Sequence, residues 1–500
     1  MSNKVYTDQK TNSEVTLFDF LDLNSFLTHI NLMFNITGSY TDLYQLTMAE
    51  VYYKTNRSNK TAVFDYSFRK LPFHGGYAIF CGLEVVLDML ENLKFSDSDL
   101  DFLSKNGFSD DFIAYLADFT FTGKIYASLE GDLVFATRPI LQVEAPLIEA
   151  QIVETLILNI LNYQTLIATK ASRMRYVAGS AKLVDFGLRR GQSTAAYHAS
   201  RAAIIGGFDS TSNVKAAIDY DLNPSGTMAH AFIQSYNQEI DAFRDFGKYR
   251  PHDCVLLVDT YNTLISGVPN AIKVAKEMEA RGERVKGIRL DSGDLAYLSK
   301  KARKMLDDAD LPSVKIAVSN QLDELVIKSL KEQNAPIDLY GVGTSVMIGK
   351  PDAALDGVYK LAVYNNQPSI KISESTEKVT IPGRKQVYRL TDHQGDWIGA
   401  DIISLRHEEN LYTMHSPYDP LKSMSVEKYS KEPLLHLVME NGKQQSTPKS
   451  VDEIAAFAKS QLDQLDISYK RFDNAHIYKI GLSDELYQLR NELITKNKKR

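Results

Sequence analysis

Residues Val285–Leu295 read VKGIRLDSGDL, an apolar, β-branched run that ends at an arginine and is followed by two acidic residues around a Ser-Gly turn. A short run of this kind, bounded by turn residues, is typical of a buried parallel strand. Similar runs, separated by helical patterns at about 25 to 30 residue spacing, lie along the same part of the chain. They are 255–258, 314–318 and 337–342. Four successive βα units predict an α/β barrel or a doubly wound sheet.

The sequence also predicts several helices. Pro269 marks the first turn of one helix, and a longer buried helix is predicted between Pro146 and Ala178. The helix after the strand at 314–318 is expected to begin at Ser319 or Asn320. Its predicted apolar face consists of Leu322, Leu325, Val326 and Leu330.

The chain has 500 residues, which is too long for one compact core. Residues 1–38 are predicted to be an N-terminal extension, and Met33 is an alternative start. Residues 39–150 are expected to form an α+β unit with a helix near 44–53 and a strand at 62–68. The barrel is predicted to span 151–355, and short strands with turns follow at 356–500, with a helix at 451–465.

Composition excludes several classes of protein. The chain has 57 Lys+Arg against 63 Asp+Glu, a formal charge of −6 that does not favour nucleic acid or an anionic membrane as partner. No apolar run is expected to reach the roughly 18 residues of a membrane helix, and no secretory leader is recognisable. Cys81 and Cys254 cannot form a disulfide framework, so a cytoplasmic location is expected.

Two loops in the first half of the barrel region carry candidate binding groups. In Asp185–Arg190, DFGLRR, Phe186 offers a stacking face for a flat ring and Arg189 a fork for phosphate or carboxylate, although an arginine pair is often only a solvated face. In Ser225–His230, SGTMAH, Thr227 and His230 lie beside backbone donors that suit an anion.

Two later loops add a cation, carboxylates and glycines. Arg289 is followed by Asp291 and Asp294, whose oxygens suit ribose hydroxyls or hydrated Mg²⁺, or a cap on the next helix. Gly341, Gly343 and the hydroxyl of Thr344 directly follow a strand, as a phosphate cradle requires. Neither a Walker A sequence nor a strand-linked Gly-x-Gly-x-x-Gly occurs, so a sugar-phosphate transferase fits the four loops best.

At these residues the chain resembles the nicotinate phosphoribosyltransferases, from about Tyr40 to Leu493. The segments that carry the resemblance are YTDLYQLTM at 40–48, FRKLPF at 68–73, DFGLRR at 185–190, GGFDSTSN at 206–213, GTMAH at 226–230, LDSGDL at 290–295 and GVGTS at 341–345. The family implies an irregular α/β barrel of the type II phosphoribosyltransferase kind. It also implies an α+β domain built from the N-terminal and C-terminal regions, and a homodimer with shared active sites.

The resemblance implies transfer of phosphoribose from phosphoribosyl pyrophosphate to nicotinate, the first step of NAD salvage from nicotinate, with Mg²⁺ and coupled ATP hydrolysis. Tyr44 of the partner subunit and Phe186 would enclose the nicotinate ring, and Thr227 and Arg289 would meet its carboxylate. The other implied roles are Arg189 near a phosphate or the ring, Asp291 on the ribose or metal, Asp294 on the metal through water, and Gly341, Gly343 and Thr344 on the 5′-phosphate.

The resemblance further implies that His230 is phosphorylated by ATP. Two departures from the family pattern lie nearby. Ala231 replaces a common serine, and Gly191 replaces a common alanine, a change that is expected to loosen the backbone.

Three other functions remain open at this point. A nicotinamide phosphoribosyltransferase is disfavoured by Arg289, because an amide gains less from a guanidinium than a carboxylate does. A non-catalytic relative that senses a nucleotide would bind ligands without turnover. An unrelated metal-dependent barrel enzyme would lose tight metal binding when Asp291 and Asp294 are removed.

Overall fold

The computed structural model describes residues 36–375 and 378–498. The predicted extension at 1–38 and the alternative start at Met33 therefore lie almost entirely outside the described residues. The described residues divide into two compact units, one made of 36–40 and Leu93–Phe119, the other of Thr41–Asn92 and the described residues from Thr120 onward.

The smaller unit contains a pair of short helices, α4 (Asp97–Lys105) and α5 (Asp110–Ala117). Ser96 begins α4 with a capping box, in which its hydroxyl accepts from the Asp99 amide and the Asp99 carboxylate accepts from the Ser96 amide. The rings of Phe95 and Phe119 meet edge to face, with centroids 5.5 Å apart. These contacts give the pair a small apolar core of its own.

A six-stranded sheet forms the centre of the larger unit, and every pairing in it is parallel. Its order is β7-β6-β11-β10-β9-β8, made of β6 (Lys182–Asp185), β7 (Ser210–Thr211), β8 (Val255–Leu257), β9 (Gly287–Leu290), β10 (Lys315–Ser319) and β11 (Leu339–Val342). The four strands predicted from β-branched runs are confirmed as β8 to β11. Within the described residues β7 and β8 do not pair with each other, so the expected barrel is irregular and open between them.

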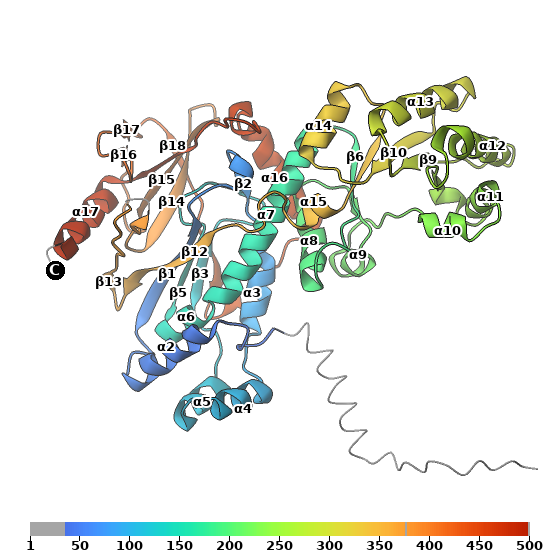
Figure 1. Cartoon of the computed structure of the whole chain (residues 1–500). Coiled ribbons are helices and arrows are strands. Elements are labelled where there is room, and N and C mark those ends of the chain that lie inside the picture. Colours follow the sequence, from blue (N-terminus) through green and yellow to red (C-terminus); the bar gives the residue numbers. More distant parts are fainter. Residues whose placement is uncertain (1–35, 376–377, 499–500) are drawn as a thin grey trace, which may run out of the picture. The chain divides into compact units, whose positions relative to one another are not determined.

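Helices flank this sheet, as Figure 1 shows. They are α8 (Thr194–Ile205), α9 (Val214–Tyr220), α10 (His230–Gln234), α11 (Glu239–Tyr249), α12 (Val268–Glu279), α13 (Leu295–Asp308), α14 (Glu324–Glu332) and α15 (Thr344–Met347). Their apolar sides join the strands in one large buried core.

The predicted start of α14 is wrong, and its predicted apolar face is right for Leu322 and Leu330 but wrong for Leu325 and Val326. Asn320 and Gln321 have φ angles of 81° and 49°, which no helix accepts, so the chain turns there and the helix begins later. Asp323 is the cap, and its carboxylate accepts from the amides of Leu325 and Val326. In the observed helix the buried face contains Ile327 and Leu330, whereas Leu325 and Val326 are exposed in the first turn.

The long helix predicted between 146 and 178 is present as α6 (Leu147–Ile152) and α7 (Glu154–Ala178), with a turn at Val153 between them. By length and composition this 32-residue stretch is the one candidate for a membrane span among the described residues, and the expectation that no such stretch exists was wrong. Of its most apolar window, 67% is buried inside the protein, as in the core helix of many water-soluble proteins.

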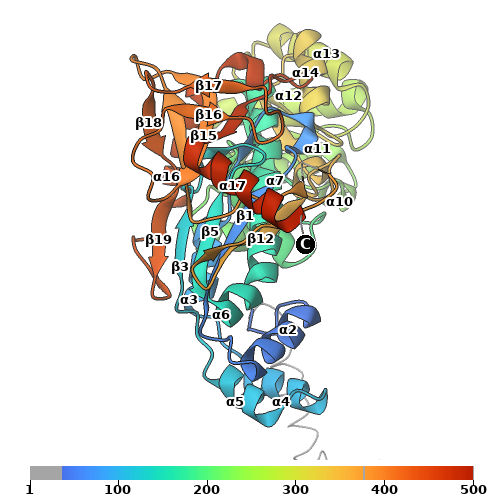
Figure 2. The same cartoon turned by 90° about the vertical axis from the view of Figure 1, so that its left-hand side faces the viewer.

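A seven-stranded antiparallel sheet joins segments from both ends of the chain. Its order is β13-β12-β1-β5-β3-β19-β20. The strands are β1 (Thr61–Phe68), β3 (Lys124–Ala127), β5 (Leu141–Pro146), β12 (Gly357–Tyr364), β13 (Gln367–Pro368), β19 (His436–Glu440) and β20 (Lys443–Gln444). Figure 2 shows β19 beside β3. The α+β domain built from N-terminal and C-terminal regions is thereby confirmed.

A third sheet is made wholly of C-terminal strands. Its order is β17-β16-β21-β15-β14-β18. The strands are β14 (Lys385–Thr391), β15 (Trp397–Leu405), β16 (Thr413–His415), β17 (Ser423–Ser425), β18 (Ser430–Pro433) and β21 (Lys479–Leu482). The remaining elements of the larger unit are α2 (Leu43–Lys54), α3 (Leu83–Glu91), α16 (Val451–Gln464), α17 (Asp484–Lys498) and a two-stranded ladder of β2 (Ala78–Ile79) and β4 (Leu133–Val134).

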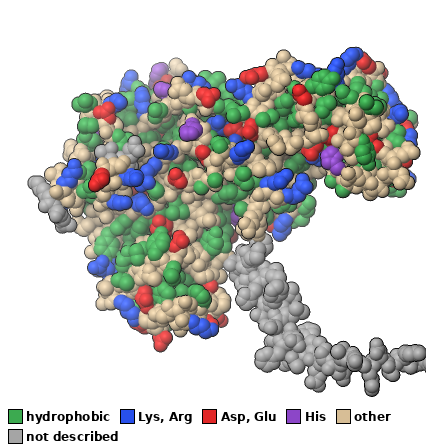
Figure 3. All heavy atoms as spheres, viewed as in Figure 1, with side chains coloured by type: hydrophobic (Ala, Val, Ile, Leu, Met, Phe, Trp, Pro, Cys, Tyr) green, Lys and Arg blue, Asp and Glu red, His purple; other side chains and the backbone are tan. Residues whose placement is uncertain are grey.

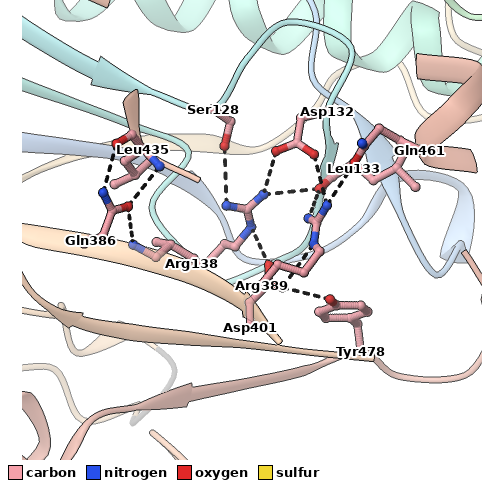
Figure 4. A network of polar contacts seen from close by, with 11 residues as sticks. Ser128, Asp132, Leu133, Arg138, Gln386, Arg389, Asp401, Leu435, Gln461 and Tyr478 are labelled. Atoms are coloured by element: carbon pink, nitrogen blue, oxygen red, sulfur yellow. Dashed lines mark hydrogen bonds and ion pairs between the residues drawn. The ribbon is translucent and has the colours of Figure 1, made fainter. Parts of the chain in front are cut away.

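Two fully buried arginines connect the N-terminal and C-terminal strands (Figure 4). Arg389 Nη1 lies 3.1 Å from Asp132 Oδ1 and its Nε lies 3.3 Å from Asp401 Oδ1. Arg138 Nε lies 3.2 Å from Asp401 Oδ2. The Tyr478 hydroxyl donates to Asp401 Oδ1 over 2.8 Å. We call Asp132, Arg138, Arg389 and Asp401 the buried strut.

Candidate active site

The predicted loops meet at the carboxyl-terminal edge of the parallel sheet. Phe186 directly follows β6, Arg289 lies in β9 with Asp291 just after it, and Gly341 and Gly343 lie at the end of β11. Parallel strands end at one edge of a sheet, so these loops are neighbours in space although the sequence separates them. His230 joins them from the first residue of α10.

Arg289 is the best-anchored side chain of this site. Its Nε donates to Ser319 Oγ over 2.9 Å, and its Nη2 donates to Asp291 Oδ1 over 2.9 Å. Its Nη1 donates to Thr227 Oγ1 over 3.1 Å and to the carbonyl of Met228 over 3.3 Å. A guanidinium has five N–H groups, so these contacts leave one N–H with no partner among the described residues. The cation is therefore fixed in place yet able to receive an anion.

An aromatic ring faces this cation. The Arg289 guanidinium carbon lies 5.2 Å from the centroid of the Phe186 ring. This distance is within the range of cation–π attraction. A flat aromatic acid stacked on Phe186 would bring its carboxylate beside Arg289.

Buried groups determine the backbone that presents Phe186. Asp185 Oδ1 accepts from the Gly187 amide over 2.7 Å, and its Oδ2 accepts from Ser200 Oγ and Thr211 Oγ1 over 2.8 and 2.7 Å. Burial raises the pKa of Asp185. These hydrogen bonds hold the turn after β6 in one conformation.

The glycines of the loop after β11 pack against the turn that carries Phe186. The space that a Cβ would take at Gly341 is filled by the Phe186 ring, and at Gly187 it is filled by Met347. Gly343 lies against the Phe186 carbonyl. Gly341 therefore makes room for the aromatic ring, a role separate from the phosphate contact that the resemblance implies.

His230 and Asp291 lie close together beside Arg289. His230 Nδ1 lies 3.0 Å from Thr260 Oγ1, and its Nε2 lies 3.8 Å from Asp291 Oδ2. The Asp291 carboxylate also accepts from Ser319 Oγ. The imidazole is 39% exposed, so a group from solvent can reach it.

Sequence reasoning missed Asp259 and Thr260, which lie one residue beyond the end of β8. Asp259 Oδ2 accepts from the Asp291 amide over 2.8 Å and from Ser292 Oγ over 2.6 Å, while Thr260 contacts His230. Asp259 Oδ1 is buried and has no hydrogen-bond partner. The sequence did carry a signal for these two residues. An acid and a hydroxyl directly after a predicted parallel strand follow the same pattern as the other candidate loops.

Three predicted residues make less contact with this cluster. Arg189 and Thr344 are exposed, and they belong to the site by their position in the loops after β6 and β11. Asp294 caps α13, since its carboxylate accepts from the Tyr297 amide over 3.0 Å, which is the helix-cap alternative raised for this residue. Gly191 packs against Ala196, so the backbone there is close-packed and not loose.

Tyr44 belongs to a different cleft of the same chain. It lies half exposed on α2 and lines a cavity of ≈ 360 Å³ together with Tyr163, Leu166 and Leu355. The Tyr163 hydroxyl donates to the Met347 carbonyl over 2.6 Å, so α15 separates this cleft from the turn that carries Phe186. Burial and the carboxylate of Glu154 raise the pKa of Tyr44.

Three family models match the chain in succession. They are the N-terminal domain of nicotinate phosphoribosyltransferase at residues 40–162, the nicotinate phosphoribosyltransferase family at 181–395, and the C-terminal domain of the same enzyme at 384–490. Together they include every loop described above.

Whole-chain relatives agree with these models. A nicotinate phosphoribosyltransferase of Bacillus subtilis is 44% identical over 92% of this chain and 96% of its own. One of Dictyostelium discoideum is 32% identical over 98% of this chain and 91% of its own. The crystal structure of human nicotinic acid phosphoribosyltransferase matches with a TM-score of 0.81 at 29% identity, over 91% of this chain and 99% of its own.

Proposed function

This chain belongs to the nicotinate phosphoribosyltransferase family, and we propose that it couples the transfer of phosphoribose onto nicotinate to the hydrolysis of ATP. The products of the transfer are nicotinate mononucleotide and pyrophosphate. The observation that supports this most directly is the anchored Arg289 guanidinium beside the Phe186 ring, with one N–H unpartnered.

Nicotinate is a flat ring that carries one carboxylate, and this pair of groups is complementary to it. The ring would stack on Phe186, and the carboxylate would receive the remaining N–H of Arg289 and the hydroxyl of Thr227. Tyr44 of the partner subunit would cover the other face of the ring in a homodimer. The separation of Tyr44 from Phe186 within one chain supports a site shared between two chains.

The phosphoribosyl group would occupy the neighbouring loops. Gly343 and Thr344 would offer backbone and hydroxyl donors to the 5′-phosphate, with Arg189 close by, and Asp291 would accept from the ribose hydroxyls. In the transfer, the pyridine nitrogen lone pair forms a bond to the anomeric carbon as the bond to pyrophosphate breaks. Both electrons of that bond leave with pyrophosphate, so the protein's part is positioning and charge stabilisation.

The oxygens present fit Mg²⁺. Asp259 Oδ1 is buried without a partner, and Asp291 lies one hydrogen bond away from it. The described residues contain no group of three or more metal-ligating side chains, which suits an ion held mainly by substrate phosphates and water. Asp259 and Asp291 would hold the ion, and Mg²⁺ when bound would neutralise charge on pyrophosphate.

His230 would take the γ-phosphoryl group of ATP. A ring-nitrogen lone pair attacks the γ-phosphorus, the bond to ADP breaks, and water later releases phosphate from the imidazole. The contact with Thr260 holds the ring, and its exposure leaves it open to the nucleotide. We place the reaction in the cytoplasm, which suits the two buried, unpaired cysteines.

The test is mononucleotide formation by purified protein with phosphoribosyl pyrophosphate and Mg²⁺, on nicotinate or nicotinamide, each with and without ATP. We expect turnover of nicotinate that ATP stimulates. His230→Ala should retain transfer and lose the stimulation, with His252→Ala, a histidine away from the site, as its control. Equal stimulation in wild type and His230→Ala would refute the coupling, and preference for nicotinamide would refute the role of Arg289.

A further inference from the structure

The carboxyl-terminal end of β10 lies in the middle of the candidate site. The sheet order places β10 between β9 and β11. Its last residue, Ser319, pairs in register with Gly341 of β11, and the residue before it pairs with β9. Ser319 therefore lies between the strand that carries Arg289 and the strand whose glycine makes room for the Phe186 ring.

Ser319 is buried, unlike the charged side chains around it that a substrate would meet. Its exposed fraction is 3%, whereas the Arg289 and Asp291 side chains are 17% and 29% exposed. Figure 3 shows charged side chains of both signs spread over the surface of the molecule, including the part that contains the parallel sheet. Ser319 does not belong to this surface, so it can act on a ligand only through the side chains that it contacts.

The hydrogen bonds of the Ser319 hydroxyl run in one direction only. Its oxygen accepts from Arg289 Nε over 2.9 Å. A guanidinium has no acceptor, so the hydroxyl proton serves the second contact, in which Ser319 donates to Asp291 Oδ1. Arg289 Nη2 donates to the same carboxylate oxygen over 2.9 Å. The three side chains therefore form a closed triangle of hydrogen bonds in which two members are charged.

This triangle holds two groups that have different tasks. The contact at Nε, together with those at Nη1, prevents rotation of the Arg289 guanidinium, so its remaining N–H keeps one direction. Two donors hold Asp291 Oδ1, and the other oxygen, Oδ2, lies 3.8 Å from His230 Nε2. Without the hydroxyl, Arg289 Nε would lose its acceptor and Asp291 Oδ1 would lose one of its two donors.

We propose that Ser319 is a positioning residue for both substrates of the transfer. Its hydroxyl orients Arg289 toward the carboxylate of nicotinate and Asp291 toward the ribose of phosphoribosyl pyrophosphate. This inference rests on the proposed function, from which it takes the roles of Arg289 and Asp291. Ser319 itself touches neither substrate. Loss of its hydroxyl should weaken both contacts at once, whereas loss of Arg289 should weaken mainly the contact to nicotinate.

The test compares Ser319→Ala with Ser299→Ala in the full-length protein. Ser299 is a fully buried serine of α13 whose hydroxyl donates to the Ala296 carbonyl over 3.2 Å, so it is a matched control. In Ser319→Ala we expect the ratio of kcat/KM for nicotinate to kcat/KM for nicotinamide to fall about fivefold, as the loss of one hydrogen bond to a charged group predicts. The KM for phosphoribosyl pyrophosphate should rise by about the same factor. Ser299→Ala should match wild type in both measurements.

A double-mutant cycle with Arg289→Gln shows whether Ser319 acts through Arg289. Ser319→Ala should lower the substrate ratio in the wild type and leave it unchanged when added to Arg289→Gln. The rise in KM for phosphoribosyl pyrophosphate should persist in that background, because Asp291 is still present. Equal changes of the ratio in the two backgrounds, or an unchanged ratio in Ser319→Ala, would overturn the proposal.

Crystal structures of the wild type and Ser319→Ala separate this inference from the proposed function. If the wild type turns over neither nicotinate nor nicotinamide, the assigned reaction fails, and the two structures still decide whether Ser319 holds its neighbours. An Arg289 guanidinium that leaves Thr227 or Asp291 in Ser319→Ala would support the positioning role. Arg289 and Asp291 in their wild-type positions would overturn it.

Discussion

The active site and the buried strut are both built from arginine and aspartate, and they use these residues in opposite ways. In the strut, Arg138 and Arg389 are less than 2% exposed, and Asp132 and Asp401 lie between them. In the active site, the Arg289 side chain is 17% exposed and the Asp291 side chain 29% exposed. Each cluster draws its residues from distant parts of the chain.

The difference lies in which polar groups a ligand can reach. The Arg389 guanidinium also donates to Leu133 and Gln461 and lies 3.9 Å from the Trp397 ring centroid, and its side chain is only 1% exposed. The carboxylates of Asp132 and Asp401 raise the pKa of Arg389 above its usual value. Around Arg289, one N–H has no partner among the described residues, and the side chains of Arg289 and Asp291 reach solvent at the edge of the sheet. Burial makes a cluster of this kind structural, and exposure at an open edge makes it a candidate binding site.

Arg389→Met should give the largest effect. It leaves the carboxylates of Asp132 and Asp401 buried with less compensation, so we expect a loss of about 4 kcal/mol in the free energy of unfolding. Urea unfolding measures it. Arg384→Met, which removes a partly exposed pair with Glu144, should cost less than about 1 kcal/mol. A similar loss in both variants would contradict the distinction.

Arg289→Gln should separate activity from stability. We expect kcat/KM for nicotinate to fall about 100-fold, equal to about 3 kcal/mol, because the charge-assisted contact to the carboxylate is lost. The value for nicotinamide should change far less. Arg281→Gln, at an exposed ion pair, is the control. An unchanged ratio of kcat/KM for nicotinate to kcat/KM for nicotinamide would show that Arg289 does not bind the carboxylate.

A histidine beside a buried ion pair should make the stability of the protein depend on pH. Arg201 pairs with Glu130, and burial, with the Arg201 charge, lowers the pKa of the neighbouring His198 to about 4. The unfolded chain has the ordinary value of about 6.5 and binds the proton first, so stability falls as pH drops from 6.5 toward 4. From pH 7 to pH 5 the loss from this residue should be about 2 kcal/mol. His198→Gln should remove that part of the pH dependence, and an identical profile in the variant would exclude His198 as its source.

Thr260→Val should produce the smallest of these effects. It keeps the shape of the side chain but removes the hydroxyl that lies 3.0 Å from His230 Nδ1. We expect a loss of about 1 kcal/mol, seen as about fivefold weaker stimulation by ATP with smaller change in transfer without ATP. Thr263→Val is the matched control. Equal losses with and without ATP would mean that Thr260 acts on the fold and not through His230.

The sequence predicted the features that depend on local pattern. The apolar runs that became β8 to β11 and the residues after them were sufficient to place Arg289, Asp291 and Gly343 at one edge. The start of α14 was missed because two residues with positive φ lengthen the loop, and Asn320 and Gln321 carry no certain sign of that conformation. Propensity alone does not separate a cap from a turn residue.

Local sequence patterns did not predict which distant strands and side chains pair with each other. Nothing in the residues of β19 indicates that its partner is β3, and the buried strut likewise joins residues 132 and 389 by tertiary packing alone. The domain built from both ends of the chain was predicted from the family resemblance. The periodicity of the apolar residues predicted only the individual strands. Asp259, in contrast, could have been predicted. It lies just after a predicted parallel strand, which is the position for which the other candidate residues were chosen.

The sheet that joins the two ends of the chain also constrains the order of events during synthesis. β3, near residue 125, pairs with β19, near residue 438, so its edge has no permanent partner until the ribosome has almost finished. At about 5 to 20 residues per second this interval lasts about 15 to 60 s. An open strand edge is a template for pairing with other chains during that time. We therefore expect the nascent protein to depend on chaperones, and expression at lower temperature to raise the soluble yield.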